Sequence, residues 1–533
     1  MRLLPFLSLW PLFVLAILAR DLPGRRPLVD LGYSKYQGVR LATGVDQFLG
    51  MRFAAPPLDH LRFRAPRDPI QHSAVQDASE FGPVCIGVDQ NVTTSQAEDC
   101  LFINVFTPSG SNRTSKLPVW VYIQGGGYTS NANANYNGTG VVQESARNII
   151  LVNFNYRVGA LGFLSGDVLR HDGDHNVGLL DQRKALQWVQ RHIRNFGGDP
   201  EHVVIHGASA GAGSVAFHLT ANGGRDEGLF VGAIAQAPSF TVQRTIGESN
   251  VYLDRLLDRV GCTTISCLRS RAASAIQASV FAPTGSPAAA TYIASLVWVP
   301  VIDGRLVQRR LYAAFEEGRF VRVPLMVGGV TDEGSAFAYN ASSREDVTEF
   351  TQGIFPTLRS TDLWAINKAY PRLPPVPRHG AYFPTASAIL TDAAFTCPGL
   401  HMTRSKARRG CRDSWNYRYN VQDPFSQAMG WGVPHTVETT AIFGLDYGGG
   451  IGFPSMADTN APIIPIVMNY FISFVRELDP NTLRHGTAPF WQPWGAARQR
   501  LKIETNDTVM ERVPSVQQAR CALFKRLAPI TKQ

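Results

Sequence analysis

The chain has 533 residues, of which 44% are hydrophobic and 17% are charged, so it can bury a large apolar core. Its formal net charge is +9, but the basic residues are dispersed, and the densest runs are short ones at 24–27 and 404–412. A nucleic-acid-binding protein would gather this charge on one face or helix. The sequence therefore argues against a nucleic-acid partner and for a large globular protein.

The N-terminus predicts a signal peptide. Arg2 is followed by an apolar run over 3–19 and then by polar residues. The alternative is a membrane anchor, but the run is at the short limit for a spanning helix and contains Pro5 and Pro11. We expect a signal peptide at 1–19 and a single secreted domain over 20–533. No later stretch reaches spanning length, so we expect no stable membrane span.

Export favours disulfide bonds and glycans. The chain has 7 cysteines, so at least one thiol is unpaired, and it has no CxxC pair of the kind found in zinc ribbons and thioredoxins. Five Asn-x-Ser/Thr sequons become candidate glycosylation sites: Asn91, Asn112, Asn137, Asn340 and Asn506. If they carry glycans, these asparagines lie at the surface.

The first segment that suggests a chemical role lies at 118–127. An apolar strand is predicted over 118–123, and a loop with Gly125, Gly126 and Gly127 follows it. Three successive glycines let backbone N–H groups face inward without side-chain obstruction. Such a loop is either merely flexible or an oxyanion site that binds the negative charge formed during acyl transfer.

A helix is predicted over 181–196, followed by a Gly-Gly-Asp-Pro turn, a strand over 202–207 and a second helix after Ser209. Ser209 is the centre of a GxSxG motif, which by itself is a weak signal in a chain with 48 glycines. A strand that turns sharply into a helix exposes such a serine above the sheet. The alternative is a small-residue turn that serves packing only.

A serine nucleophile needs an acid and a base later in the chain. A strand-like segment at 323–330 precedes Asp332 and Glu333, and another at 414–420 precedes a Gly/Pro loop with His435. Either carboxylate could orient an imidazole. His435 is one of 12 histidines, so its candidacy depends on its order and spacing after Ser209.

Several segments resemble the type-B carboxylesterase/lipase family, which includes cholinesterases and fungal lipases. "FGGDPEHVVIHGASAG" at 196–211 is similar to the family's serine signature, and "EDCLFINVF" at 98–106 is similar to its second signature. The resemblance runs in family order from about residue 28 to 530, and secreted fungal carboxylesterases look most similar. It implies an α/β-hydrolase fold, with a large, mostly parallel sheet flanked by helices and helical insertions around the active-site gorge.

The resemblance also implies roles for individual residues. Ser209 is the expected nucleophile, Glu333 rather than Asp332 the acid, and His435 the base. The expected oxyanion donors are the amides of Gly126, Gly127 and Ala210. The expected substrate is a small-molecule ester, cleaved without a metal or cofactor.

Similarity further implies disulfides Cys85–Cys100, Cys262–Cys267 and Cys397–Cys521, leaving Cys411 as a free thiol. Cys397–Cys411 is the rival pairing. If 398–410 is helical, the ends of that segment lie about 20 Å apart, too far for a direct bridge.

Departures from the family bear on the substrate. The loop between Cys85 and Cys100 has 14 residues and no aromatic or apolar helical face, unlike the long lid of the lipases or the tryptophan-bearing loop of the cholinesterases. We therefore expect an esterase without a long lid. Gln124, Ala208 and Ala237 replace the His, Glu and Ser of many members.

The alternatives to such an esterase are lipase or sterol-esterase-like activity, a natural-product tailoring hydrolase or acyltransferase, and a non-catalytic binding protein. The sequence does not predict the oligomeric state.

Overall fold

The computed structural model of the chain describes residues 26–131, 135–278, 297–448, 453–495 and 497–533. The predicted signal peptide at 1–19 lies outside the described residues. In the part of the chain that is described, no helix is long and apolar enough to cross a membrane.

The centre of the fold is one large sheet, in which eleven strands pair within the described residues. In spatial order these strands are β16 (Val509–Arg512), β15 (Gln499–Ile503), β14 (Ser414–Tyr419), β13 (Leu325–Val330), β12 (Gly232–Gln236), β11 (Gly198–Ala208), β9 (Leu117–Ile123), β10 (Ile150–Phe154), β8 (Phe102–Pro108), β4 (Val45–Arg52) and β3 (Val39–Arg40). The seven strands from β15 to β10 run parallel, and the outer strands pair antiparallel. Parallel pairing brings the carboxyl ends of β11 to β14 to one edge, where ligands bind in open α/β sheets.

Two smaller sheets lie beside the large one and comprise β1 (Leu28–Asp30), β2 (Lys35–Gln37) and β5 (Val75–Asp77), and β6 (Val84–Cys85) and β7 (Gln96–Ala97). The helices of the first half are α1 (Thr139–Glu144), α2 (Gly159–Phe163), α3 (Leu169–Asp172), α4 (Val177–His192), α5 (Ala210–Thr220), α6 (Ile246–Val260), α7 (Ile265–Arg269) and α8 (Ala273–Gln277). Those of the second half are α10 (Leu311–Glu317), α11 (Arg344–Ile354), α12 (Ser360–Ala369), α13 (Phe383–Leu390), α14 (Cys397–Arg408), α15 (Pro424–Ala428), α16 (Thr439–Phe443), α17 (Ile463–Glu477) and α18 (Ser515–Thr531).

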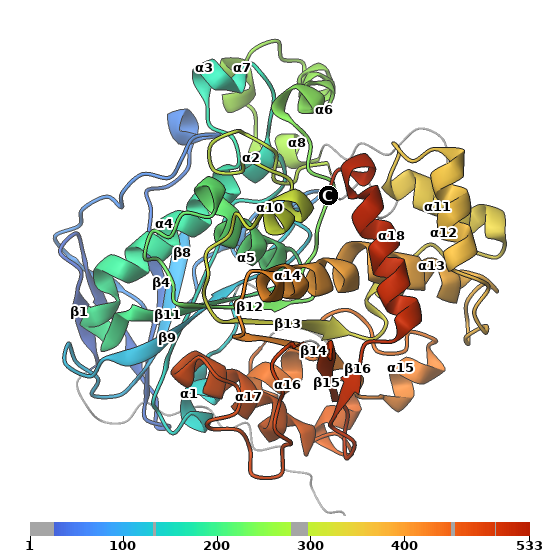
Figure 1. Cartoon of the computed structure of the whole chain (residues 1–533). Helices are drawn as coiled ribbons and strands as arrows, with labels where there is room; N and C mark the ends of the chain where they lie inside the picture. Colours follow the sequence, from blue (N-terminus) through green and yellow to red (C-terminus); the bar gives the residue numbers. More distant parts are fainter. Residues whose placement is uncertain (1–25, 132–134, 279–296, 449–452, 496) are drawn as a thin grey trace, which may run out of the picture.

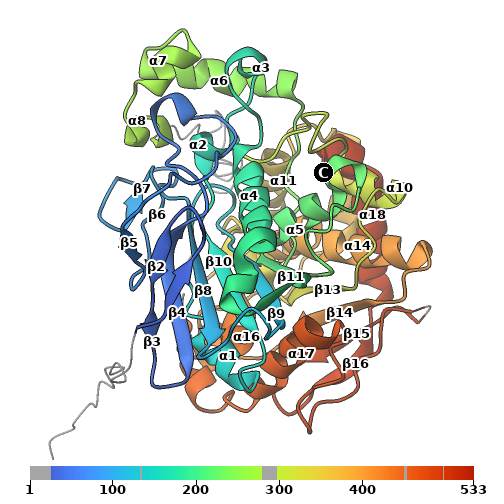
Figure 2. The same cartoon turned by 90° about the vertical axis from the view of Figure 1, so that its left-hand side faces the viewer.

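Helices cover both faces of the sheet, because its central strands are apolar on both sides. In β9, Val119 and Val121 belong to the core between the sheet and helices α4 and α5. Trp120 and Tyr122 belong to the core on the opposite face, between the sheet and helices α16 and α17. This alternation follows from the two-residue period of a strand. Figure 1 shows α4, α5 and α10 above the sheet and α1, α16 and α17 below it, and the view turned by 90° in Figure 2 shows the same two layers.

The region around Gly-Gly-Asp-Pro differs in detail from the sequence prediction. α4 ends at His192, a 3-10 turn follows over Ile193–Phe196, and Gly197 with φ +90° ends that turn. Strand β11 then begins at Gly198, so the rest of the tetrapeptide lies in the strand, next to an irregularity between Gly198 and Val203. Gly198 pairs with Leu117 of β9, so this segment is extended and does not form a free turn.

All seven cysteines are described, and six of them form the bridges Cys85–Cys100, Cys262–Cys267 and Cys397–Cys521. Cys397 begins helix α14, and the half-buried Cys411 follows the end of this helix as a free thiol. The rival pairing Cys397–Cys411 is therefore absent. The Cys397–Cys521 bridge ties α14 to the C-terminal helix α18 in a third apolar core.

Removal of this bridge is expected to destabilise the protein. It joins residues 124 positions apart, so the double variant Cys397→Ala/Cys521→Ala should lower the free energy of unfolding by about 4–5 kcal/mol. Urea denaturation measures this change. Cys411→Ala, which removes the unpaired thiol, is the control and should change the unfolding midpoint little. Equal midpoints for the two variants would contradict the structural importance of the bridge.

Candidate active site

Ser209 lies in a strained turn between β11 and α5. Its φ of +58° and ψ of −122° fall outside the usual regions for a residue with a side chain. Two glycines allow this turn. A Cβ at Gly207 would lie 2.1 Å from the Gly211 carbonyl oxygen, and a Cβ at Gly211 would lie 2.1 Å from the Ile123 carbonyl oxygen. The small residues thus permit α5 to start directly above the sheet, with Ser209 at the turn.

The glycine loop after β9 packs against this turn. A Cβ at Gly125 would lie 3.0 Å from the Cβ of Ser209. Gly126 and Gly127 have φ angles of +105° and +64°, which favour glycine. On the other side of Ser209, Ala210 is the first residue of α5, so its amide belongs to the helix N-terminus, where developing negative charge is favoured.

The neighbouring strands β13 and β14 lead to Glu333 and His435. Glu333 Oε2 contacts His435 Nδ1, and Glu333 Oε1 accepts a hydrogen bond from the Val330 amide at 2.7 Å. Asp332 points elsewhere, since its Oδ2 accepts from the Val433 amide at 2.9 Å. Of the two adjacent carboxylates, only Glu333 therefore reaches the imidazole.

The imidazole of His435 is held between aromatic rings. Its centroid lies 5.0 Å from that of Phe337 and 4.7 Å from that of Phe395, and its side chain is 7% exposed. Among the described residues, Nε2 has no hydrogen-bond partner. Because Nδ1 faces a carboxylate, the tautomer with hydrogen on Nδ1 is favoured, which leaves Nε2 free to accept a proton.

Hydrogen bonds join the serine turn to the histidine loop across the sheet edge. The Ser209 amide donates to the Gln236 carbonyl at the end of β12, at 2.9 Å. The Gln236 side-chain amide in turn donates to Thr439 Oγ1 at 3.0 Å, and Thr439 is only four residues beyond His435. Residues 209, 333 and 435 thus follow β11, β13 and β14, whose carboxyl ends lie at one edge of the sheet.

Sequence reasoning missed Glu438, a buried carboxyl three residues after His435. Glu438 is 1% exposed, and the Tyr417 hydroxyl donates to it at 3.5 Å. Burial, followed by repulsion from Glu333, raises the pKa of Glu438 to about 8. A glutamate in a polar loop sequence carries no signal of burial, so only the packing of α16 could reveal it.

The raised pKa of Glu438 makes stability depend on pH. The folded protein keeps this proton up to about pH 8, whereas the unfolded chain releases it near 4.5. This contribution to stability is therefore present below about pH 4.5 and is lost as pH rises to 8. We expect Glu438→Gln to reduce the fall in thermal midpoint between pH 5 and 8, compared with the exposed-site control Glu345→Gln. An unchanged fall would contradict the assignment.

The three departures from the family also have a place in the structure. Ala208 is fully buried in the apolar core below the sheet, and Ala237 is fully buried with φ +53°. The Gln124 side-chain amide donates to Asn131, at the other end of the glycine loop. Ala208 and Ala237 thus offer no polar group behind the Ser209 turn and the Glu333 carboxylate.

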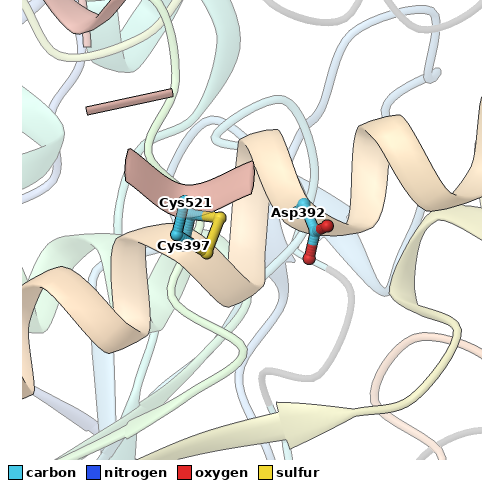
Figure 3. A group of neighbouring side chains, drawn as sticks. All are labelled: Asp392, Cys397 and Cys521. Atoms are coloured by element: carbon cyan, nitrogen blue, oxygen red, sulfur yellow. A yellow bond between two sulfur atoms is a disulfide. The ribbon is translucent and has the colours of Figure 1, made fainter. Parts of the chain in front are cut away.

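One other group resembles a metal site by composition. Asp392 lies beside Cys397 and Cys521, with potential ligand atoms within 4.8 Å of one another (Figure 3). The two sulfurs are joined in a disulfide and cannot act as thiolate ligands. In this state the group therefore does not offer the donors that a soft metal requires.

The parallel sheet with helices on both faces is the α/β-hydrolase fold, as the sequence predicts, and the strained serine turn at its edge is typical of hydrolases of this fold. The model of the Carboxylesterase family matches residues 25–523. Lipase 2 of Geotrichum candidum is 30% identical, with 87% of this chain and 89% of that protein covered. Secreted lipase 4 of Gibberella zeae is also 30% identical, with coverage of 89% and 86%.

The solved structure of Aspergillus niger EstA is 51% identical and superposes with a TM-score of 0.92, covering 95% of this chain and 99% of that chain. The chain belongs to the carboxylesterase family and is a carboxylic ester hydrolase. The family, the fold and the enzyme class predicted from sequence are thereby confirmed.

Proposed function

We propose that Ser209, Glu333 and His435 form the catalytic triad of this esterase. The observation that carries the proposal is the pairing of His435 Nδ1 with Glu333, which leaves Nε2 free at the same sheet edge as Ser209. His435 removes the Ser209 proton as the hydroxyl oxygen attacks the ester carbonyl carbon. Glu333 fixes the tautomer and stabilises the imidazolium that forms.

The negative charge on the carbonyl oxygen is bound by the amides of Gly126, Gly127 and Ala210. Each such donor contributes about 3 kcal/mol to lowering the barrier. The imidazolium then protonates the leaving alcohol, and the acyl group stays on Ser209. Water, deprotonated by His435, attacks the acyl-enzyme and releases the acid, which restores the free serine.

We further propose that the substrates are soluble or modest-sized esters. The segment between Cys85 and Cys100 is described throughout and contains the short strand β7 but no helix. This favours an enzyme without a long amphipathic lid over a lipase activated at interfaces. No observation favours the sterol-ester, natural-product tailoring or purely binding alternatives.

Secretion is proposed from the predicted signal peptide and is supported by the similarity to a secreted lipase. Asn91, Asn112, Asn340 and Asn506 are exposed, which suits glycosylation, whereas Asn137 is half-buried. One sheet with β3 at one edge and β16 at the other supports a single domain over 20–533. Mass spectrometry of protein from the culture medium, before and after glycosidase treatment, tests the cleavage site and the glycans.

The active-site assignment is tested with a fluorophosphonate probe on purified protein. The wild type should be labelled, and Ser209→Ala should not be. Equal labelling of the two would refute the role of Ser209. A p-nitrophenyl ester series of increasing acyl length then defines the substrate range. A sharp rise in rate when tributyrin passes from solution to emulsion would contradict the absence of a lid.

A further inference from the structure

A small cavity lies behind the carboxylate of Glu333. Its volume is about 30 Å³, and the residues around it include Ala237, Glu333, Asn416, Arg418, Arg500 and Gln517. This volume suits one or two water molecules, and the polar side chains offer them partners. Glu333 Oε1 has accepted one hydrogen bond, from Val330, and a carboxylate oxygen can accept another. Ala237 lines the same cavity and contributes no hydroxyl to it.

Two arginines of the cavity lining belong to a compact ion cluster on β14, β15 and β16. Glu511 accepts two hydrogen bonds from Arg418, at 2.8 and 2.7 Å, and a third from Arg500 at 2.6 Å. Two guanidinium groups therefore share one carboxylate, and the cluster has a net charge of +1. Arg418 and Arg500 line the same cavity as Glu333, so both guanidinium-bearing side chains border the space beside the proposed acid.

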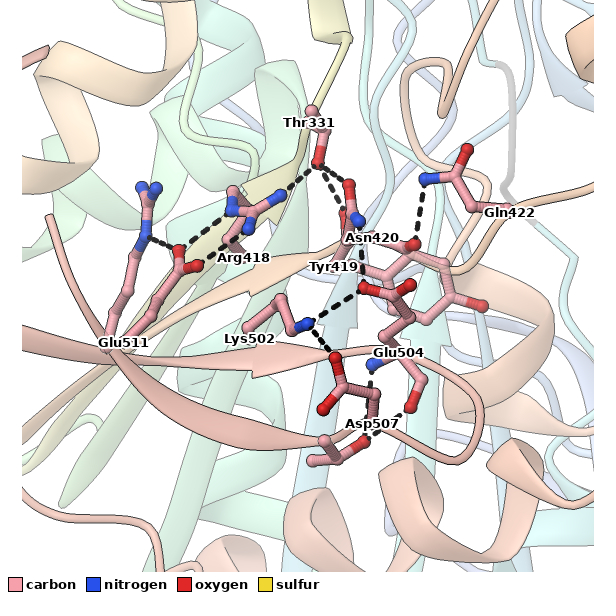
Figure 4. Close-up of polar contacts among 11 residues, drawn as sticks. Thr331, Arg418, Tyr419, Asn420, Gln422, Lys502, Glu504, Asp507 and Glu511 are labelled. Atoms are coloured by element: carbon pink, nitrogen blue, oxygen red, sulfur yellow. Dashed lines mark hydrogen bonds and ion pairs between the residues drawn. The ribbon is translucent and has the colours of Figure 1, made fainter. Parts of the chain in front are cut away.

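Arg418 also holds the chain that leads to Glu333. Its Nη1 donates to the Thr331 hydroxyl at 2.8 Å, and that hydroxyl donates to Asn420 Oδ1 at 2.5 Å (Figure 4). Thr331 follows the end of β13 and precedes Glu333 by two residues. Glu511 accepts hydrogen bonds from two other nitrogens of the same guanidinium, so Arg418 is held on both sides.

We propose that Arg418 is a positioning residue for the triad, which holds the Thr331–Glu333 turn directly and supports the Glu333 carboxylate through water in the shared cavity. This inference rests on the proposed role of Glu333. It assigns a function to a cluster that the reaction itself does not use, because neither arginine touches the reacting atoms.

The proposal has a consequence for the pH dependence of catalysis. The charged or titratable groups on the elements around Glu333 and His435 are Asp332, Asp392, Glu438, Tyr417, Arg418, Arg500 and Glu511. Loss of the Arg418 charge makes the potential at His435 more negative and stabilises the imidazolium. His435 must be neutral to act as a base, so the acidic limb of kcat/KM moves to higher pH.

The test compares Arg418→Met with Lys502→Met in the purified full-length enzyme, with p-nitrophenyl acetate as substrate. Lys502 is a matched control. It belongs to the same polar network and pairs with Glu504 at 3.1 Å. Its side chain is 16% exposed, compared with 20% for Arg418. It does not line the cavity. In Arg418→Met, kcat should fall about tenfold with KM nearly unchanged. The acidic limb should move to higher pH.

Arg418→Lys separates the two parts of the effect. The lysine keeps the positive charge, so the acidic limb of kcat/KM should stay near that of the wild type. An ammonium group cannot hold Glu511 and Thr331 together as the guanidinium does, so part of the loss in kcat seen in Arg418→Met should remain. Lys502→Met should match the wild type in both quantities. Equal kcat and equal pH limbs for Arg418→Met and Lys502→Met would overturn the proposal, as would a crystal structure with no water in the cavity.

A failure of the underlying triad assignment would look different. Glu333→Gln, measured in the same series, should lose most of its activity. If Glu333→Gln keeps wild-type kcat, the proposed role of Glu333 fails. If it loses activity while Arg418→Met behaves as the control, only the positioning role of Arg418 fails.

Discussion

Ser209→Ala is expected to lower kcat for a p-nitrophenyl ester by about 10⁶-fold, and adding His435→Ala should lower it no further. In the proposed triad the serine oxygen and the imidazole act as one unit. Without the hydroxyl there is no group for His435 to deprotonate, and without the base the hydroxyl is a poor nucleophile. Independent contributions would instead multiply, and the double variant would fall far below either single one.

The next serine in the chain after Ser209 provides a control. Ser214 is fully buried in α5 and accepts a hydrogen bond from the Gln182 side chain at 3.0 Å. Ser214→Ala removes this contact and should lower stability by about 1 kcal/mol while kcat stays within about twofold of the wild type. Steady-state kinetics with thermal denaturation measures both effects. A large loss of kcat in Ser214→Ala would show that local packing, rather than the Ser209 hydroxyl, sets the rate.

The local parts of the proposed site could be predicted from the sequence because they depend on neighbours in the chain. The β-branched run before Ser209 and the glycines around it fix a strand, a turn and a helix through short-range sterics. The choice of Glu333 over Asp332 is of another kind. Strand spacing leaves both carboxylates possible, and only the turn geometry after β13 directs one to His435 and the other to the Val433 amide.

Groups that depend on distant strands left no sequence signal. In the sequence, Arg418 is simply a polar residue in the strand-like segment at 414–420. Its partners Glu511 and Thr331 lie 93 and 87 residues away in the chain. Pairing of β14 with β13 and with β15, and of β15 with β16, brings these three side chains together. The same holds for the bridge between Cys397 and Cys521, which only the resemblance to relatives could suggest.

Gly126→Ala is expected to lower kcat by about 10²- to 10³-fold with little change in KM, because it displaces the proposed oxyanion donors. Gly126 has φ +105°, and a Cβ there would lie 2.1 Å from the Ser130 carbonyl oxygen. The Gly126 carbonyl also accepts bonds from the amides of Thr129 and Ser130, so the loop cannot relieve this clash without moving as a whole. The substrate still binds, but the charged intermediate loses its donors.

Gly127→Ala is the matched change in the same loop. Its φ of +64° disfavours alanine by about 1 kcal/mol, but the nearest atom to the added Cβ is Thr129 Oγ1, at an ordinary contact distance of 3.4 Å. This variant should therefore keep its loop geometry and lose less than about tenfold in kcat. Steady-state kinetics of both variants, with thermal midpoints as a check on folding, makes the comparison. If Gly126→Ala keeps wild-type kcat, the loop does not bind the oxyanion, and Ala210 at the start of α5 would have to provide that stabilisation with other donors.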